Sequence, residues 1–314
     1  MTGSCAPVRL LLLVAAQCAQ LCTVVAQNVA SGSHSVVSGG KWNTVTGAYS
    51  SVAGGLSNVV SSYSSSIGGG NYNTVTSYWA NIAAGSGNTV HGAAAVIAGG
   101  ASNIALGTYS SVLGGSSNYV TGTAATIAGG HYNSVTGQFN SMLGGLYNLV
   151  DDARLATLGG GQENTASANA SFVGGGTFNV ASGAYGLVTG GHKNTVTKLY
   201  SSIGGGVANI ASGPWATIGG GSGNSVGAAG ASVAGGIGNV VAAYSSTVGG
   251  GRWNAVSSYW GTVAGGSGNS VRGMAAAIAG GVGNIASHSY SAVLGGDSNT
   301  VLGSWTAICG GRDN

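Results

Sequence analysis

The chain has 314 residues, of which 63 are glycine, while charged residues make up only 4%. A typical soluble domain has about 25% charged residues and about 7% glycine, so this composition excludes an ordinary globular domain. The net charge of +3 is spread over single basic residues, which excludes a nucleic-acid surface because phosphate binding needs clustered cations.

The first 26 residues predict a secretory signal peptide. Arg9 precedes an apolar stretch over residues 10–21, and small residues stand before Gln27, where a signal peptidase would cut. A membrane anchor is the alternative, but Gln17 and Gln20 interrupt the stretch, which is shorter than the ~20 residues of a bilayer span. We therefore expect an exported protein, secreted or on the cell surface, with a mature part over residues 27–314 and no transmembrane anchor.

Only one of the four cysteines, Cys309, lies in this mature part, so no intrachain disulfide is expected. In its column of the repeat other coils carry Ala or Leu. We therefore expect Cys309 to be a small packed or half-buried side chain rather than a reactive thiol.

A 15-residue repeat, G-G-x-x-N-x-V, runs through the mature part. Twenty asparagines keep one register with a single 16-residue step, and a fixed short period of this kind predicts a solenoid. They are Asn28, Asn43, Asn58, Asn73, Asn88, Asn103, Asn118, Asn133, Asn148, Asn164, Asn179, Asn194, Asn209, Asn224, Asn239, Asn254, Asn269, Asn284, Asn299 and Asn314.

Other columns share this register. Val or Ala usually follows the asparagine by two residues, a small residue by seven and an aliphatic residue by nine, as in Val45, Ser50 and Val52. Residues two apart share a face of a strand, and the Gly-Gly pair supplies a turn with positive φ. The sequence therefore predicts an all-β parallel β-solenoid (β-roll) of about nineteen coils, each with two short strands and two turns. One coil buries too little to fold alone, so the coils must stack.

The asparagine column predicts an inward hydrogen-bonded ladder, because identical amides one coil apart can donate and accept at once. The alternative, a row of ligands for sugar or metal, is less favoured. The only glycosylation sequon is Asn169-Ala170-Ser171, which lies outside the ladder in a turn and marks Asn169 as a possible N-glycosylation site.

A column of aromatic residues stands six residues after many ladder asparagines. These rings could stack on sugars, could contact a neighbouring solenoid, or could cap the open edge of the core. The column contains Tyr49, Trp79, Tyr109, Phe139, Tyr185, Tyr200, Trp215, Trp260, Tyr290 and Trp305.

Pairs of threonines flank the inward valine in a few coils. Thr44 and Thr46, Thr74 and Thr76, and Thr195 and Thr197 would point their hydroxyls outward, as on a flat ice-binding face. Most other coils break this pattern, so ice binding is the alternative rather than the leading hypothesis.

The densest charge accompanies the 16-residue step, where the extra residue falls within Asp151-Asp152-Ala153-Arg154-Leu155. We interpret it as a bulged turn that tolerates an insertion. A binding loop using Asp151, Asp152 and Arg154 is the alternative.

Motifs for catalysis are absent from the sequence. The glycine-rich strings lack the Gly-Lys-Ser/Thr of a phosphate loop. The five histidines lie coils apart, so we expect neither a catalytic triad, nor a metal site, nor a cofactor, and we predict that the protein is not an enzyme.

The strings Ser51-Val52-Ala53-Gly54, Ser232-Val233-Ala234-Gly235 and Thr262-Val263-Ala264-Gly265 resemble the head repeats of trimeric autotransporter adhesins. The resemblance covers the repeats of nearly all of residues 27–314. It implies a left-handed parallel β-roll, three chains side by side, and binding to host matrix or other cells. The 15-residue period, the Gly-Gly pair and the asparagine column depart from that family's pattern.

The leading hypothesis is therefore a secreted or cell-surface structural or adhesive rod. Its partners would be extracellular matrix, glycans, a cell surface or sister chains, as a homotrimer or by end-to-end stacking. The alternative is an ice- or carbohydrate-binding protein with a flat Thr or aromatic face. Because the last repeat stops at Asn314, we also expect the chain to be a fragment of a longer protein.

Overall fold

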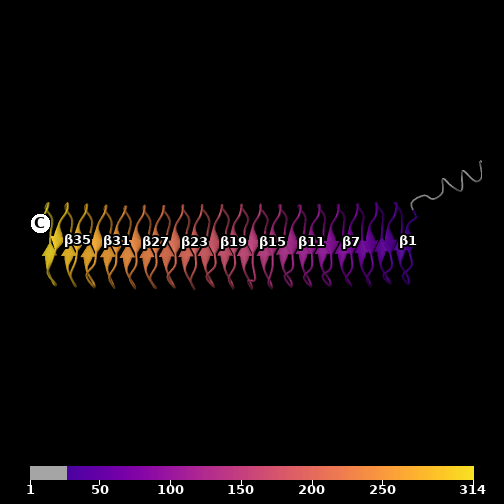
Figure 1. Cartoon of the computed structure of the whole chain (residues 1–314), viewed down its shortest axis with the longest axis horizontal. Helices are drawn as coiled ribbons and strands as arrows, with labels where there is room; N and C mark the ends of the chain where they lie inside the picture. Colours follow the sequence, from indigo (N-terminus) through magenta and orange to yellow (C-terminus); the bar gives the residue numbers. More distant parts are fainter. Residues whose placement is uncertain (1–26) are drawn as a thin grey trace, which may run out of the picture.

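The computed structural model describes residues 27–314, and the predicted signal peptide over residues 1–26 lies outside the described residues. The described chain is a straight rod of stacked coils, running from β1 at the indigo end to the yellow C-terminal end (Figure 1). Each coil has two strands of two residues and two turns. The predicted parallel β-solenoid with 15-residue coils is therefore confirmed.

One strand of every coil belongs to a sheet that we call sheet A, and each of its strands begins directly after a ladder asparagine. Its nineteen strands are β1 (Val29–Ala30), β3 (Thr44–Val45), β5 (Val59–Val60), β7 (Thr74–Val75), β9 (Thr89–Val90), β11 (Ile104–Ala105), β13 (Tyr119–Val120), β15 (Ser134–Val135), β17 (Leu149–Val150), β19 (Thr165–Ala166), β21 (Val180–Ala181), β23 (Thr195–Val196), β25 (Ile210–Ala211), β27 (Ser225–Val226), β29 (Val240–Val241), β31 (Ala255–Val256), β33 (Ser270–Val271), β35 (Ile285–Ala286) and β37 (Thr300–Val301).

The other strand of every coil belongs to the opposite sheet, sheet B. Its strands are β2 (Val36–Val37), β4 (Ser51–Val52), β6 (Ser66–Ile67), β8 (Asn81–Ile82), β10 (Val96–Ile97), β12 (Ser111–Val112), β14 (Thr126–Ile127), β16 (Ser141–Met142), β18 (Thr157–Leu158), β20 (Phe172–Val173), β22 (Leu187–Val188), β24 (Ser202–Ile203), β26 (Thr217–Ile218), β28 (Ser232–Val233), β30 (Thr247–Val248), β32 (Thr262–Val263), β34 (Ala277–Ile278), β36 (Ala292–Val293) and β38 (Ala307–Ile308).

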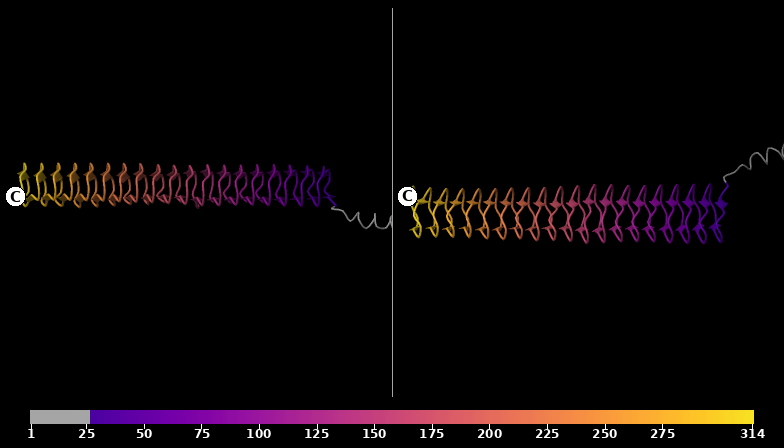
Figure 2. Two further views of the ribbon diagram at one scale, coloured as in Figure 1. Left: turned by 90° about the horizontal axis from the view of Figure 1, so that it is seen from above. Right: turned by 60° about the horizontal axis from the view of Figure 1, so that its bottom comes forward.

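Every strand pairs in parallel with the equivalent strand of the next coil. Thr44 lies opposite Val59 in sheet A, and Ser51 lies opposite Ser66 in sheet B, each 15 residues apart. Neighbouring parallel strands lie about 4.8 Å apart, so the stack is roughly 90 Å long. Figure 2 shows the same regular stack from two further directions.

The core between the sheets receives four side chains from each coil. In one coil these are Asn58, Val60, Ser65 and Ile67, and all four are buried. The aliphatic residue is the second of each two-residue strand, so its side chain points inward while the first points to solvent. The core is therefore one continuous thin layer along the rod.

The ladder asparagines form the predicted hydrogen-bonded column. The Nδ2 of Asn58 donates to the Gly54 carbonyl of its own coil at 3.1 Å and to the Gly70 carbonyl of the next coil at 2.7 Å. Its Oδ1 accepts the backbone N–H of Asn73 at 3.0 Å. Buried amides bonded in this way do not bear the cost of unsatisfied polar groups.

Each of the two turns contains a residue in the left-handed conformation. In the turn that holds the glycine pair, which we call the Gly-Gly turn, Gly55 has φ +99° and Ser57 has φ 53°. In the other turn, which we call the second turn, Tyr49 has φ 57°. Whereas the Val59 N–H in the strand donates forward to the next coil, the Ser57 N–H donates back to Lys41 at 2.9 Å. The left-handed residues thus bond backbone groups that would otherwise lack a partner.

The extra residue of the long coil lies in a turn, as the sequence led us to expect, and it leaves the strand ladders intact. Ser141 pairs with Thr157 and Met142 with Leu158, so the ladder of sheet B continues unbroken. The residue is absorbed by the second turn, which has six residues between β17 and β18, as many as a Gly-Gly turn has between β4 and β5. Leu155 has φ 61° and its N–H donates back to Gln138 at 3.1 Å, as the equivalent residue of a Gly-Gly turn does.

Candidate interaction surfaces

No aromatic side chain of this protein is in the core. The sequence contains 13 Tyr, 6 Trp and 3 Phe, and all of them are exposed, from Phe172 at 38% to Trp305 at 76%. Aromatic residues usually supply much of the buried surface of a core, and exposed ones are enriched at interfaces. Their positions on the rod are therefore candidate interaction surfaces.

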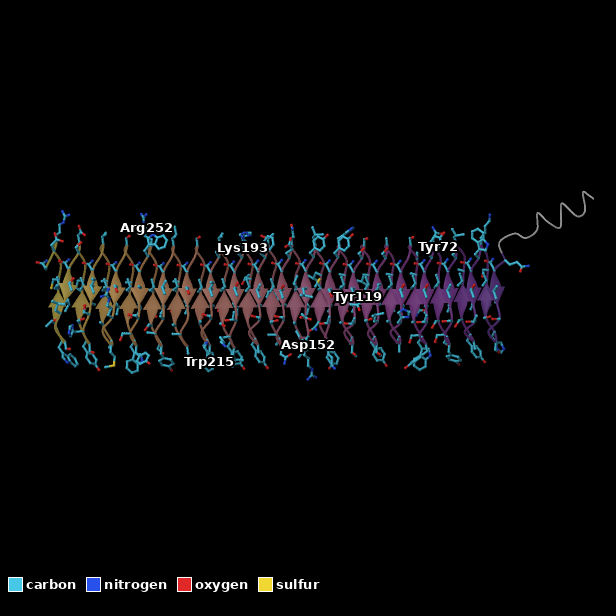
Figure 3. All side chains as sticks on the ribbon, in the orientation of Figure 1. Tyr72, Tyr119, Asp152, Lys193, Trp215 and Arg252 are labelled. Carbon is cyan, nitrogen blue, oxygen red and sulfur yellow. The ribbon has the colours of Figure 1, made fainter. Side chains whose placement is uncertain are left out.

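Most of these rings lie along the second turns, on a line that we call the aromatic edge. Figure 3 shows Trp215 on this lower edge. The edge contains fourteen aromatic residues: Tyr49, Tyr63, Tyr78, Trp79, Tyr109, Phe139, Tyr185, Tyr200, Trp215, Tyr244, Tyr259, Trp260, Tyr290 and Trp305. The predicted aromatic column is thus an exposed stripe along this edge.

Neighbouring rings of the aromatic edge stack on one another along the rod. The ring centroids of Tyr185 and Tyr200 lie 4.8 Å apart at an interplanar angle of 21°, and Trp215 continues this stack at 6.3 Å from Tyr200. Tyr290 and Trp305 stack at 4.1 Å. The one-coil rise of the solenoid therefore matches the spacing at which aromatic rings stack.

A second, sparser aromatic set lies on the opposite edge, along the Gly-Gly turns, and the sequence reasoning missed it. Figure 3 shows one member, Tyr72, on this upper edge with Lys193 and Arg252. Each member directly precedes a ladder asparagine, and this simple pairing could have revealed the set. It consists of Trp42, Tyr72, Tyr132, Tyr147, Phe178 and Trp253.

Charged side chains avoid the outer face of sheet B throughout the described chain. That face consists of the first residue of each strand and the residue after the strand, mostly Ser or Thr followed by Ala or Gly, as in Ser232 and Ala234. Lys41, Lys193 and Arg252 lie on the Gly-Gly edge. The outer face of sheet B is therefore neutral, and most of its side chains are small, with larger exposed ones such as Leu113, Phe172 and Leu187 among them.

The predicted threonine pairs lie on the outer face of sheet A, in coils that are not adjacent. Thr44 and Thr74 are separated by Val59 in the coil between them, and Tyr119 also stands in this column (Figure 3). Thr76 is in contact with the His91 ring of the next coil. The outer face of sheet A thus has no continuous column of threonines.

The charged residues of the insertion are exposed but do not pair with one another. The Thr136 hydroxyl lies 3.2 Å from Asp151 Oδ1 and accepts the Asp152 N–H at 2.6 Å. The Arg154 guanidinium lies over the Phe139 ring, 5.7 Å from its centroid. The structure therefore brings Arg154 to the aromatic edge, next to a ring of the predicted column.

Asn169 of the glycosylation sequon is exposed in the second turn after β19, outside the ladder. Its Oδ1 accepts the backbone N–H of Arg154 at 3.0 Å, and a glycan would be attached to Nδ2 of the same amide. Ser171 of the same sequon is buried.

Cys309 is exposed, which corrects the expectation of a packed or half-buried side chain. It follows the last strand of sheet B, β38, and its column of the repeat points to solvent rather than into the core. The Ala and Leu residues of that column, such as Leu113 at 54% exposure, are likewise outside. The apolar residues in this column suggested that Cys309 is buried. Its position in the pleat of the strand points its side chain to solvent instead.

Within residues 27–314, one hollow of about 220 Å³ is lined by Ala242, Ala243, Ser257, Ser258 and Tyr259. The same residues of the chain contain no group of three or more His, Cys, Asp or Glu that could hold a metal ion. No helix in this part of the chain is long and apolar enough to cross a membrane.

Comparison with protein-family models finds no match to this chain, and a search among curated proteins finds no relative.

Proposed function

We propose that the protein is a secreted or cell-surface structural and adhesive rod that contacts its partners through the aromatic edge. The observation that carries this proposal is the exposure of every aromatic residue, with fourteen of them on one edge.

The build of the rod supports a structural role. Each coil is held to the next by two strand pairings, by the bridge in the Gly-Gly turn and by the asparagine ladder, as between Asn58 and Asn73. Such repetition gives a stiff spacer whose outer residues can vary without cost to the core. The variable outer residues are then free to serve recognition.

The composition of the aromatic edge supports adhesion. Tyr and Trp are the side chains that most often dominate binding energy at interfaces, because they present large rigid surfaces with a polar group at the rim. Isolated rings such as Tyr109, exposed at 65%, are open to a partner. The likeness of the repeats to adhesin heads points to the same class of partner: matrix, glycans, other cells or sister chains.

Adhesion of beads coated with the mature protein, residues 27–314, tests this function. Beads would be presented to cells, to matrix proteins and to immobilised neutral glycans. Trp215→Ser together with Tyr200→Ser should reduce capture several-fold, because these neighbouring rings on the aromatic edge are lost. Trp253→Ser with Tyr72→Ser, which removes two rings from the Gly-Gly edge, is the matched control. Equal capture by both variants and the parent protein would refute an adhesive aromatic edge.

A second candidate function, ice binding, has support from the outer face of sheet B rather than from the threonine pairs of sheet A. Only sheet B presents a face without charged residues, with hydroxyls of Ser232 and Thr247 in adjacent coils 3.2 Å apart. Thermal hysteresis of the mature protein, abolished by Thr247→Tyr but kept in Thr74→Tyr, would establish this function. Absence of hysteresis in the parent protein would rule it out.

A further inference from the structure

Along the first half of the rod, aromatic and small residues alternate on the aromatic edge. The residues concerned occupy one position of the second turn, and all have φ between 51° and 58°. In coil order they are Tyr49, Ser64, Trp79, Ala94, Tyr109, Ala124 and Phe139.

The alternation leaves gaps of defined width between the rings. Coils rise about 4.8 Å each, so rings in alternate coils lie roughly 9.6 Å apart. In the same column Tyr185 and Tyr200, in adjacent coils, stack with centroids 4.8 Å apart. Each gap therefore has the width that one additional ring would fill, in contact with a ring on either side.

Two of these gaps hold an alanine, which carries only a methyl group, although the Tyr78 ring packs edge-on against Trp79 at 5.0 Å beside the first of them. Ala94 separates Trp79 from Tyr109, and Ala124 separates Tyr109 from Phe139. The gap at Ser64 is narrowed, because the Tyr63 ring of that coil packs edge-on against Tyr49 at 5.4 Å. We refer to the positions of Ala94 and Ala124 as the two slots.

The segment that holds the slots carries no formal charge of its own. Between Lys41 and Asp151 the sequence has no Asp, Glu, Lys or Arg, although Arg154 of the next coil lies over Phe139 at the end of the segment. Two copies of the segment therefore meet without repulsion between like charges.

We propose that the alternating segment is a self-association site, in which rings of a second copy of this chain enter the two slots. The inference rests on the proposed function, since it names a sister chain as a partner of the aromatic edge. Rings such as Tyr109 of one rod would lie in the slots of the other and continue the ring stacking seen at Tyr185 and Tyr200.

The geometry also sets the relative direction of the two rods. In a parallel pair, a two-fold axis along the rod would place equivalent rings at the same height, so Trp79 would face its own copy. In an antiparallel pair, the two-fold axis runs perpendicular to the rod. If it passes midway between two coils, each ring of one rod faces a coil of the other rod that carries a small residue. Only the antiparallel pair therefore both interdigitates and closes as a two-fold dimer.

Sedimentation velocity of the mature protein over a range of concentrations tests the association. We expect a monomer–dimer equilibrium that Ala94→Tyr with Ala124→Tyr weakens at least tenfold, because the variant rings fill the slots. Ala208→Tyr is the matched control: Ala208 has φ 54°, close to 53° for Ala94 and 51° for Ala124, but lies on the Gly-Gly edge. This control should dimerise like the parent protein.

Resonance energy transfer tests the direction. Cys309 is the only cysteine in residues 27–314 and is exposed, so it can carry donor or acceptor dyes. In the antiparallel dimer the two Cys309 residues lie at opposite ends, and transfer between mixed labelled chains should be absent. Efficient transfer within the dimer would overturn the antiparallel arrangement.

The remaining outcomes of these experiments test self-association and adhesion separately. A monomer at every concentration, or a dimer that the slot-filling variant leaves intact, would overturn self-association. A monomer whose aromatic edge captures a neutral polysaccharide would overturn it as well, while the adhesive function stands. A slot-dependent dimer without bead capture would preserve self-association and refute adhesion to foreign surfaces.

Discussion

The Oδ1 of Asn140 accepts the backbone N–H of Ala156 in the next coil at 2.8 Å. Its Nδ2 donates to the carbonyls of Thr136 at 2.6 Å and Ala153 at 2.7 Å. A ladder asparagine makes the same three kinds of bond in the Gly-Gly turn, whereas other coils carry Ser, Ala, Gly or Thr at the Asn140 position. The insertion thus gives the second turn of this coil the geometry of a Gly-Gly turn. Asn140 supplies the hydrogen bonds that the backbone groups of this turn need.

Asn140→Ala should destabilise this part of the rod by about 1–3 kcal/mol, because the N–H of Ala156 and two carbonyls lose their partner in a buried place. Hydrogen exchange of the Ala156 amide should accelerate accordingly. Ser65→Ala is the comparison: its hydroxyl accepts the Ala80 N–H at 3.2 Å and lies 3.1 Å and 2.7 Å from the Tyr63 and Ser77 carbonyls. The effect should be smaller, because a hydroxyl has one donor hydrogen where the amide has two. Unchanged exchange at Ala156 in the Asn140 variant would contradict this role.

The ladder should tolerate a carboxylate poorly. In Asn209→Asp one oxygen would face the carbonyls of Gly205 and Gly221, each now 3.0 Å from Nδ2, and burial would raise the pKa of that carboxyl above its unfolded value of about 3.9. A group whose folded pKa is raised costs stability above its unfolded pKa and regains it on protonation.

We therefore expect the Asn209→Asp rod to be at least about 3 kcal/mol less stable than the parent at pH 7, and to recover part of this loss as the pH falls toward 4. Urea unfolding at pH 7 and pH 4 measures both effects. Asn209→Ala, which cannot titrate, should show no such recovery. An equal loss at both pH values would show that the carboxylate is not buried.

The two glycines of one Gly-Gly turn should differ sharply in their tolerance of substitution. Gly55 has φ +99°, and a Cβ there would overlap the Gly70 carbonyl of the next coil, whereas a Cβ on Gly54 would meet nothing within 4 Å. Gly55→Ala should cost at least about 1–3 kcal/mol, and Gly54→Ala should be nearly neutral. Midpoints of urea unfolding compare the two, and similar midpoints would refute the difference.

The thiol of Cys309 should react in the native protein. Because the side chain is exposed, a maleimide should label it at a rate close to that of the unfolded chain. Mass spectrometry after brief labelling provides the measurement. Protection by a factor of a hundred or more in the native state would indicate that the side chain is covered.

The repeat alone was sufficient to predict the architecture. Asn58, Val60, Ser65 and Ile67 stand at spacings that allow one arrangement, with all four inside and the residues between them outside. A period of 15 residues with Gly-Gly at a fixed place predicts a coil of two short strands and two turns. Because equivalent residues of successive coils then lie above one another, the sequence also predicts that the coils stack.

The details of the surface were harder to predict. The aromatic residues before ladder asparagines, such as Trp253, occur in only six coils and do not form a continuous column in the sequence. The apolar residues in the column of Cys309 favoured a packed or half-buried side chain, whereas its position after the strand exposes it.

Residue spacing specifies the coil, its core columns and the asparagine ladder, because each depends on distances along the chain and on residue types that one geometry satisfies. The stacked structure was needed to show how the insertion is absorbed and how rings in successive coils lie against one another. Those properties depend on contacts between residues 15 or 16 positions apart, such as Tyr185 with Tyr200 and Asn140 with Ala156. Such contacts exist only once the coils are stacked.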